Sequence, residues 1–200
     1  MKALKVISIL VVMALMLTGV AAFRAPARAQ TDSPSAEGSI IIYSPELGEV
    51  GPGAPLANET DLAMQGTGWA AEGISAFKTF KPYGWGTLTR KYAASEAWVH
   101  APLVATSYLN GVAQKLRYVE FCAKSSNGVS TKPITLDVWN NTGKTSSDAI
   151  AWPADNAYHC IGKTYATPAF HQSVGISVKL HFANGTDTIT LYKAWARMGP

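Results

Sequence analysis

The sequence predicts an all-β fold, namely a single antiparallel β-sandwich of the jelly-roll kind with long loops, preceded by a signal peptide. Short runs of alternating apolar and polar residues recur at fairly even spacing after residue 60, and clusters of turn residues separate them. Helical periodicity is hard to find in the same region. Short, evenly spaced strands of this kind are typical of sandwiches. With 200 residues, 48% hydrophobic and 15% charged, the composition is that of an ordinary globular protein.

Residues 1–29 are expected to be a signal peptide. A positively charged start is followed by an uncharged apolar run, Val6 to Leu17, and Ala27 to Ala29 has the small-x-small form of a cleavage site. Cleavage after Ala22 is the competing site. An uncleaved anchor over 6–23 is the alternative, since 18 apolar residues stand at the lower limit for a membrane span. We therefore expect a secreted or extracytoplasmic chain with no integral membrane span after cleavage.

The distribution of charge argues against nucleic acid as a partner, although the formal net charge is +4. Four of the 17 Lys and Arg residues fall in the expected signal peptide, and no acidic residue precedes Asp32. They are Lys2, Lys5, Arg24 and Arg28. The remaining chain has 13 basic and 13 acidic residues and is neutral, so it carries no global electrostatic footprint for nucleic acid.

Two regions are expected after the signal peptide. Residues 30–60 form a flexible or Pro/Gly-rich N-terminal segment, in which Ile40 to Tyr43 is a short β-prone run. Residues 61–200 form the β-sandwich domain, because no internal repeat and no second core is visible. The predicted strands of this domain are Ala97–Val104, Leu116–Ala123, Pro133–Trp139, Tyr158–Thr164, Ser173–Phe182 and Thr188–Met198.

A β-hairpin is predicted at Asn184-Gly185, the strongest short hairpin signal in the chain. A two-residue loop there would bring the apolar faces of the last two strands together. The resulting register pairs Leu180 with Ile189, Val178 with Leu191, His181 with Thr188, and Ser177 with Tyr192.

The two cysteines, Cys122 and Cys160, are predicted to form a disulfide, because an exported chain meets an oxidising compartment. Closing a loop of about 38 residues would stabilise the fold by roughly 3 to 4 kcal/mol in the chain-entropy model. Two separate buried thiols and a zinc pair are the alternatives, although two cysteines without CxxC spacing make a poor metal site. We expect neither a metal nor a cofactor.

The aromatic residues are the most informative candidates for binding. Tyr83 and Trp85 lie among glycines and are expected on a loop, close in sequence to Lys78, Lys81 and Arg90. Exposed rings beside cations suit a polymer held by stacking and charge together. The alternatives are a loop folded back with its rings buried and lysines that merely protect a strand edge.

Other tryptophans lie on predicted strands. Trp139 falls on the face opposite Ile134, Leu136 and Val138, so we predict that it is exposed or covered by a loop and include it among the ligand-binding residues. Trp98 and Trp195 are expected in the core.

Three functions are consistent with these features. The leading hypothesis is a secreted, non-catalytic β-sandwich that binds a polysaccharide or other cell-surface polymer through the aromatic and basic loop, a layout that resembles many secreted carbohydrate-binding modules. The second is a structural or assembly subunit of a cell-surface layer or appendage. The third is a small polysaccharide hydrolase or lyase using His181 with Tyr192. It ranks last, and we assign no catalytic residue, because no convergent set of acid, base and stabilising donors is visible.

Overall fold

The structure, a computed structural model, describes residues 38–45, 53, 55, 57–105, 107–141 and 143–200. The predicted signal peptide lies outside the described residues. The described part is built almost entirely of antiparallel strands and contains no α-helix, which confirms the predicted antiparallel β-sandwich. None of its helical turns is long and apolar enough to cross a membrane.

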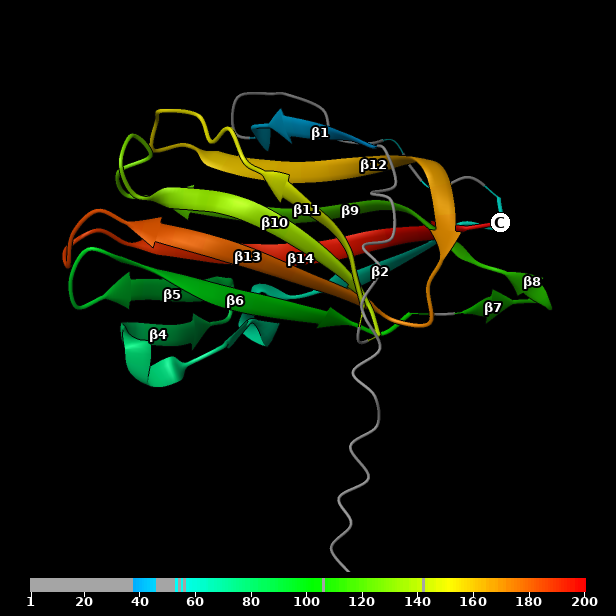
Figure 1. Cartoon of the computed structure of the whole chain (residues 1–200), viewed down its shortest axis with the longest axis horizontal. Helices are drawn as coiled ribbons and strands as arrows, with labels where there is room; N and C mark the ends of the chain where they lie inside the picture. The colour runs from blue at the N-terminus through cyan, green and yellow to red at the C-terminus, as the bar shows by residue number, and fades with distance from the viewer. Residues whose placement is uncertain (1–37, 46–52, 54, 56, 106, 142) are drawn as a thin grey trace, which may run out of the picture. The chain divides into compact units, whose positions relative to one another are not determined.

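One layer is a seven-stranded antiparallel sheet (Figure 1). Its order is β1 (Gly38–Tyr43), β12 (Tyr158–Phe170), β9 (Lys115–Ser125), β14 (Ile189–Gly199), β5 (Gly86–Lys91) and β4 (Phe77–Tyr83), with β2 (Thr60–Met64) also paired to β14. The chain's last long strand, β14, thus lies in the middle of this sheet.

The other layer is a five-stranded antiparallel sheet, and in Figure 1 its strands cross in front of β9, β14 and β5. Its order is β11 (Gly143–Ala149), β10 (Lys132–Asn140), β13 (Val174–Phe182), β6 (Ser95–Leu103) and β3 (Ala70–Ala71). A separate hairpin of β7 (Tyr108–Leu109) and β8 (Val112–Ala113) projects beside the two sheets. Two short 3₁₀ turns, η2 (Gly66–Gly68) and η3 (Ile74–Ala76), complete the described elements.

The core lies between the two sheets, where each strand buries alternate residues. In β13 the buried apolar residues are Val174, Ile176, Val178, Leu180 and Phe182, and in β14 they are Ile189, Leu191, Ala194, Ala196 and Met198. Phe77 of one layer meets Phe182 of the other edge to face, with ring centroids 6.4 Å apart. Because strand side chains alternate between faces, the remaining side chains point to the outer surfaces of the sandwich.

The hairpin predicted at Asn184-Gly185 is wrong. β13 pairs with β10 and β6, whereas β14 pairs with β9, β5 and β2, so the two strands lie in different sheets. The connection between them crosses from one layer to the other. The predicted alternation of buried and outer residues is found in both strands. Their buried faces, however, meet across the core instead of lying side by side in one sheet.

The local reason is the backbone conformation of Asn184. Neither Asn184 nor Gly185 has the positive φ that a type I′ turn requires. Instead the Asn184 side-chain oxygen accepts hydrogen bonds from the amides of Thr186 and Asp187 at 2.8 and 2.9 Å, which makes an Asx-type loop. The Asn-Gly hairpin turn of this chain occurs elsewhere, at Asn110 and Gly111, with φ of 51° and 79°, between β7 and β8.

The N-terminal strand belongs to the sandwich. β1 pairs with β12 along its whole length, from Gly38 opposite Tyr165 to Tyr43 opposite Cys160. Ile40 and Ile42 pack against the core, whereas Ile41 is exposed. The sandwich therefore includes residues that precede position 61, where sequence analysis placed its start.

Candidate functional site

Tyr83 and Trp85 lie at the tight turn that joins β4 to β5, where Tyr83 pairs with Gly86. Their rings are stacked and almost parallel, with centroids 5.2 Å apart and an angle of 4° between the planes. Trp85 is 57% exposed, so the alternative of a loop with buried rings is wrong. Gly86, directly after Trp85, allows the chain to pass close to β14, because a Cβ at this position would lie 2.7 Å from the carbonyl oxygen of Leu191.

The three predicted basic residues differ in their contacts with the ring pair. The Lys81 ammonium lies 5.1 Å from the centroid of the Tyr83 ring. Arg90 occupies the neighbouring strand, and its Nε donates a hydrogen bond of 2.6 Å to the carbonyl oxygen of Gly185. Lys78 is exposed on β4. The structure thus brings Tyr83, Trp85 and Lys81 together, whereas the Arg90 guanidinium is bonded to the loop between β13 and β14.

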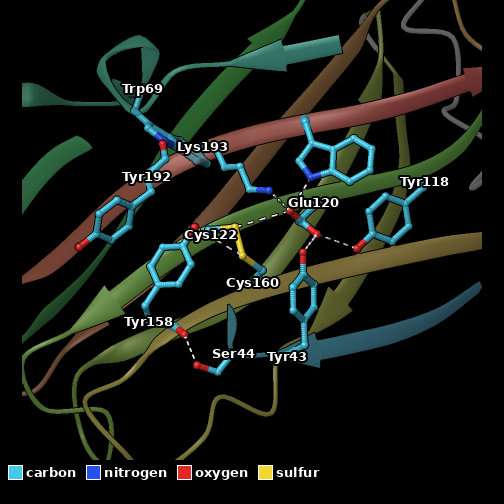
Figure 2. The surroundings of a disulfide bond; sticks show 11 residues. Tyr43, Ser44, Trp69, Tyr118, Glu120, Cys122, Tyr158, Cys160, Tyr192 and Lys193 are labelled. Atoms are coloured by element: carbon cyan, nitrogen blue, oxygen red, sulfur yellow. Dashed lines mark hydrogen bonds and ion pairs between the residues drawn. A yellow bond between two sulfur atoms is a disulfide. The ribbon is translucent and has the colours of Figure 1, made fainter. Parts of the chain in front are cut away.

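The aromatic surface continues from this turn across the outer face of the seven-stranded sheet. The Trp85 ring lies 5.9 Å from that of Tyr192 on β14, and Tyr192 contacts Tyr158 on β12 edge to face at 4.8 Å. Figure 2 shows these two tyrosines beside the disulfide. We call Tyr83, Trp85, Tyr192 and Tyr158 the aromatic strip. Sequence analysis did not single out Tyr158, because nothing in its own segment indicates which strands lie beside it.

The disulfide closes one end of the aromatic strip. Cys122 and Cys160 are direct partners across β9 and β12, with Cα atoms 4.0 Å apart, and they are joined by the predicted bond. Both are fully buried and pack with Tyr43, Tyr158 and Tyr192. The prediction of this disulfide is confirmed, and neither alternative, free thiols or a zinc pair, holds.

Beside the disulfide lies Glu120, a fully buried carboxylate on the outer side of β9 (Figure 2). It accepts hydrogen bonds from the hydroxyls of Tyr43 and Tyr118, at 2.5 and 2.9 Å, and from the indole nitrogen of Trp195. The ammonium of Lys193 lies 2.9 Å away. Burial, reinforced by the neighbouring carboxylate, raises the pKa of Tyr43 and of Tyr118 above the usual value for tyrosine.

These contacts indicate a structural role for Glu120. Its two oxygens are surrounded by donors from β1, β9 and β14, so the carboxylate joins three strands and has little capacity left for proton transfer. Glu120 was not among the predicted site residues, although an acidic residue inside the apolar run Leu116–Ala123 was a sequence signal for a site there. Trp195 was expected in the core, but it is buried on the outer face, against Tyr118.

A hollow of about 350 Å³ adjoins Trp195 on the same face. Its lining includes Asp61, Lys193 and Arg197. The Arg197 guanidinium donates two hydrogen bonds to the Asp61 carboxylate, at 2.8 and 3.0 Å. Asp61 and Arg197 are therefore paired with each other, and Lys193 is paired with Glu120.

Trp139 lies in the other layer, on the outer face of the five-stranded sheet. It pairs with Gly175 of β13 and is half-buried at the side of a hollow of about 320 Å³. The prediction that it faces away from Leu136 and Val138 is consistent with this position. Because it stands on the opposite side of the sandwich, Trp139 does not join the Tyr83 and Trp85 pair. Trp98, which was expected in the core, is half-buried on this same outer face.

The proposed pairing of His181 with Tyr192 is wrong. His181 lies on the outer side of β13, opposite Glu96, whose carboxylate is 3.7 Å from its Nδ1. Tyr192 lies on the outer side of β14 in the other sheet. The two side chains are separated by the core, because the hairpin that would have joined them does not form.

No family model matches the chain, and no curated protein matches it. Among solved structures it is similar to the carbohydrate-binding module TmCBM61 in complex with β-1,4-galactotriose, with a TM-score of 0.48 and 11% identity over 68% of this chain and 91% of that one. A family 29 carbohydrate-binding module gives a TM-score of 0.44 and 12% identity over 70% and 88%. A family 36 module in complex with calcium and xylotriose gives 0.36 and 16% over 66% and 96%.

Proposed function

We propose that this chain is a secreted, non-catalytic β-sandwich that binds a polysaccharide or other surface polymer through Tyr83 and Trp85, assisted by Lys81. The observation that supports this most directly is the stacked ring pair, in which Trp85 is exposed and Tyr83 half-buried. Large aromatic side chains are usually mostly buried, and contiguous exposed apolar patches commonly mark binding sites. The exposed part of the Trp85 ring, held in place by the Tyr83 ring stacked on it, offers a flat apolar surface on which a sugar ring can stack.

The rest of the surface favours binding over catalysis. General acid–base catalysis requires a group that can reach the substrate and exchange a proton with it. On this face Glu120 is saturated by donors, and Asp61 is held by Arg197. The aromatic strip itself offers tyrosine and tryptophan rings, with the Lys81 ammonium beside Tyr83, which suit stacking and the attraction of an anionic polymer.

Secretion is part of the proposal. The signal-like segment at residues 1–29 supports export, and a buried disulfide between Cys122 and Cys160 is consistent with an oxidising compartment.

The proposal is tested by a pull-down of the mature chain, beginning at Gln30, on insoluble and acidic polysaccharides over a range of salt concentrations. Tyr83→Ala combined with Trp85→Ala should weaken saturable binding at least tenfold, because truncation of central aromatic anchors costs that much in known interfaces. Tyr92→Ala is the matched control, since Tyr92 is an exposed aromatic outside the aromatic strip. Normal binding by the double variant would show that the site assignment is wrong.

Lys81 gives a second test of the same site. If its ammonium attracts an anionic polymer, binding to acidic polysaccharides should weaken as salt rises, and Lys81→Ala should reduce that dependence. Binding that is equally strong at low and high salt would limit the site to stacking alone.

One observation favours an assembly subunit as the second candidate. The projecting β7–β8 hairpin exposes Tyr108 and Val112, and Tyr108 contacts the exposed Phe170 at 5.8 Å. Sedimentation over a concentration series distinguishes the two functions. Self-association that is lost in Tyr108→Ser would favour assembly, whereas a monomer at every concentration would favour the polymer binder.

A further inference from the structure

On the outer face of the five-stranded sheet, two tryptophans lie on either side of a polar pair, His100 and Ser177. The register sets Trp139 and Pro102 on either side of Gly175, then His100 beside Ser177. Trp98 lies beside Lys179 in the row beyond. Their strand neighbours Val99 and Val178 are buried in the core, so these side chains share the outer surface.

The first part of this face is an uncharged hollow beside Trp139. It holds about 320 Å³, and its lining residues are Ala70, His100, Ala101, Pro102, Trp139, Gly175, Ile176 and Ser177. A Cβ at Gly175 would come within 3.4 Å of the Trp139 Cβ, so the glycine leaves room beside that side chain. Such a concave, mostly apolar lining with a few polar groups is typical of small-ligand sites.

The polar groups of the hollow are suited to hydroxyls. His100 Nδ1 lies 2.8 Å from Ser177 Oγ, which fixes the orientation of the imidazole. Nε2, the other ring nitrogen, can then donate to or accept from a ligand hydroxyl, as its tautomer allows. Among the described residues, those that line this hollow include no Asp, Glu, Lys or Arg. The Asp137 carboxylate, whose residue pairs with Ser177, is buried and bound by Ser147 and Lys144, so the chemistry favours an uncharged ligand.

A second hollow of about 320 Å³ follows along the same two strands, beside Trp98. Of its charged residues, Lys179 forms an ion pair with Glu96 and lies 6.0 Å from the centre of the Trp98 ring, while Glu72 is exposed. Trp98 and Trp139 stand two strands and four residues apart, which by ideal sheet spacing is roughly 16 Å. An elongated ligand several sugar rings in length would reach both.

We propose that this face is a second glycan-binding surface, which takes an uncharged polysaccharide segment along β6 and β13 between Trp139 and Trp98. It lies on the opposite side of the sandwich from the aromatic strip. Stacked sheets are roughly 10 Å apart, and each binding surface faces away from the other, so one short oligosaccharide does not fill both. The chain is therefore bivalent and links two polysaccharide strands. The second surface itself does not depend on the Tyr83 and Trp85 site, whereas the bivalence rests on the proposed function.

Affinity electrophoresis of the disulfide-intact mature chain tests the second surface. Native gels contain one uncharged soluble polymer each: β-1,4-galactan, glucuronic-acid-free xylan, mixed-linkage β-glucan or dextran. Wild type should be retarded by at least one of them. Trp139→Ala should weaken that retardation at least tenfold, judged from the polymer concentration required, and Trp98→Ala should weaken it as well. Trp139→Phe keeps a ring and should restore most of the binding, while circular dichroism verifies that each variant folds.

The outcomes separate the two surfaces. Retardation that persists in the Tyr83→Ala/Trp85→Ala variant but is lost in Trp139→Ala supports the second surface. Retardation unchanged in Trp139→Ala, or no retardation of wild type by any of these polymers, overturns it. In either of those cases the pull-down on insoluble and acidic polysaccharides still decides the Tyr83 and Trp85 site. As a further readout, wild type should make a solution of the bound polymer turbid, and Trp139→Ala should not.

Discussion

Removal of the Glu120 carboxylate is the perturbation with the clearest expected cost. In Glu120→Ala the hydroxyls of Tyr43 and Tyr118 and the indole N–H of Trp195 lose their acceptor, and all three side chains are buried. A buried donor left without a partner costs about 1 to 3 kcal/mol. Lys193 loses its ion-pair partner too, but its half-exposed side chain regains water.

The expected total is below the sum of three full penalties. Tyr43 and Trp195 lie at the outer face and can recover part of their loss through water, whereas Tyr118 is more deeply buried. We expect Glu120→Ala to lower the free energy of unfolding by about 3 to 5 kcal/mol, which is the cost of three buried donors left without a full partner, reduced by the water that two of them regain. Glu120→Gln should cost about 1 to 2 kcal/mol, because tyrosine hydroxyls can accept from the new amide.

The assay is guanidinium unfolding at neutral pH with the disulfide intact, followed by tryptophan fluorescence. Glu96→Ala is the matched control, since that exposed carboxylate forms a surface ion pair with Lys179 and its loss should cost less than about 1 kcal/mol. A loss below about 1 kcal/mol in Glu120→Ala, or equal losses in the Ala and Gln variants, would refute the account of Glu120 as the acceptor that holds β1, β9 and β14 together.

Two further predictions concern stability. Burial raises the pKa of Tyr43, Tyr118 and Tyr165 above 10, so above pH 10 the unfolded chain loses protons that the folded chain keeps. Stability should therefore fall as pH rises above 10, by up to about 4 kcal/mol per pH unit for three groups, and tyrosinate absorbance should develop for them only with unfolding. Absorbance from all tyrosines in the folded state would contradict this. Replacement of Cys122 and Cys160 by Ala opens a loop with a sequence separation of 38 residues. It should cost about 4 kcal/mol in denaturant unfolding, and unchanged stability would show that strand pairing alone holds β9 to β12.

The sequence predicted the strands more successfully than their partners. The alternation in Ser173–Phe182 identifies a strand with one buried face, and the structure confirms it as β13. The same alternation is satisfied whether the next strand pairs beside it or faces it across the core. The Asn-Gly dipeptide at 184 was decisive for the hairpin interpretation, yet its conformation depends on contacts from other segments. A Cβ at Gly185 would lie 2.2 Å from the carbonyl oxygen of Tyr92, and Arg90 binds the Gly185 carbonyl.

By itself, the sequence determined the fold class, the disulfide and the placement of Tyr83 and Trp85 at a turn. Periodicity, cysteine number and glycine spacing are local properties, so they can be read without knowledge of strand order. Only the tertiary structure decided which face each aromatic residue occupies. Tyr192 contacts both Trp85 and Tyr158 because β12, β9, β14 and β5 lie in one sheet, whereas Trp139 and His181 lie in the other. Side-chain neighbours across a sheet are set by pairing between distant segments, and no pattern within a single strand carries that information.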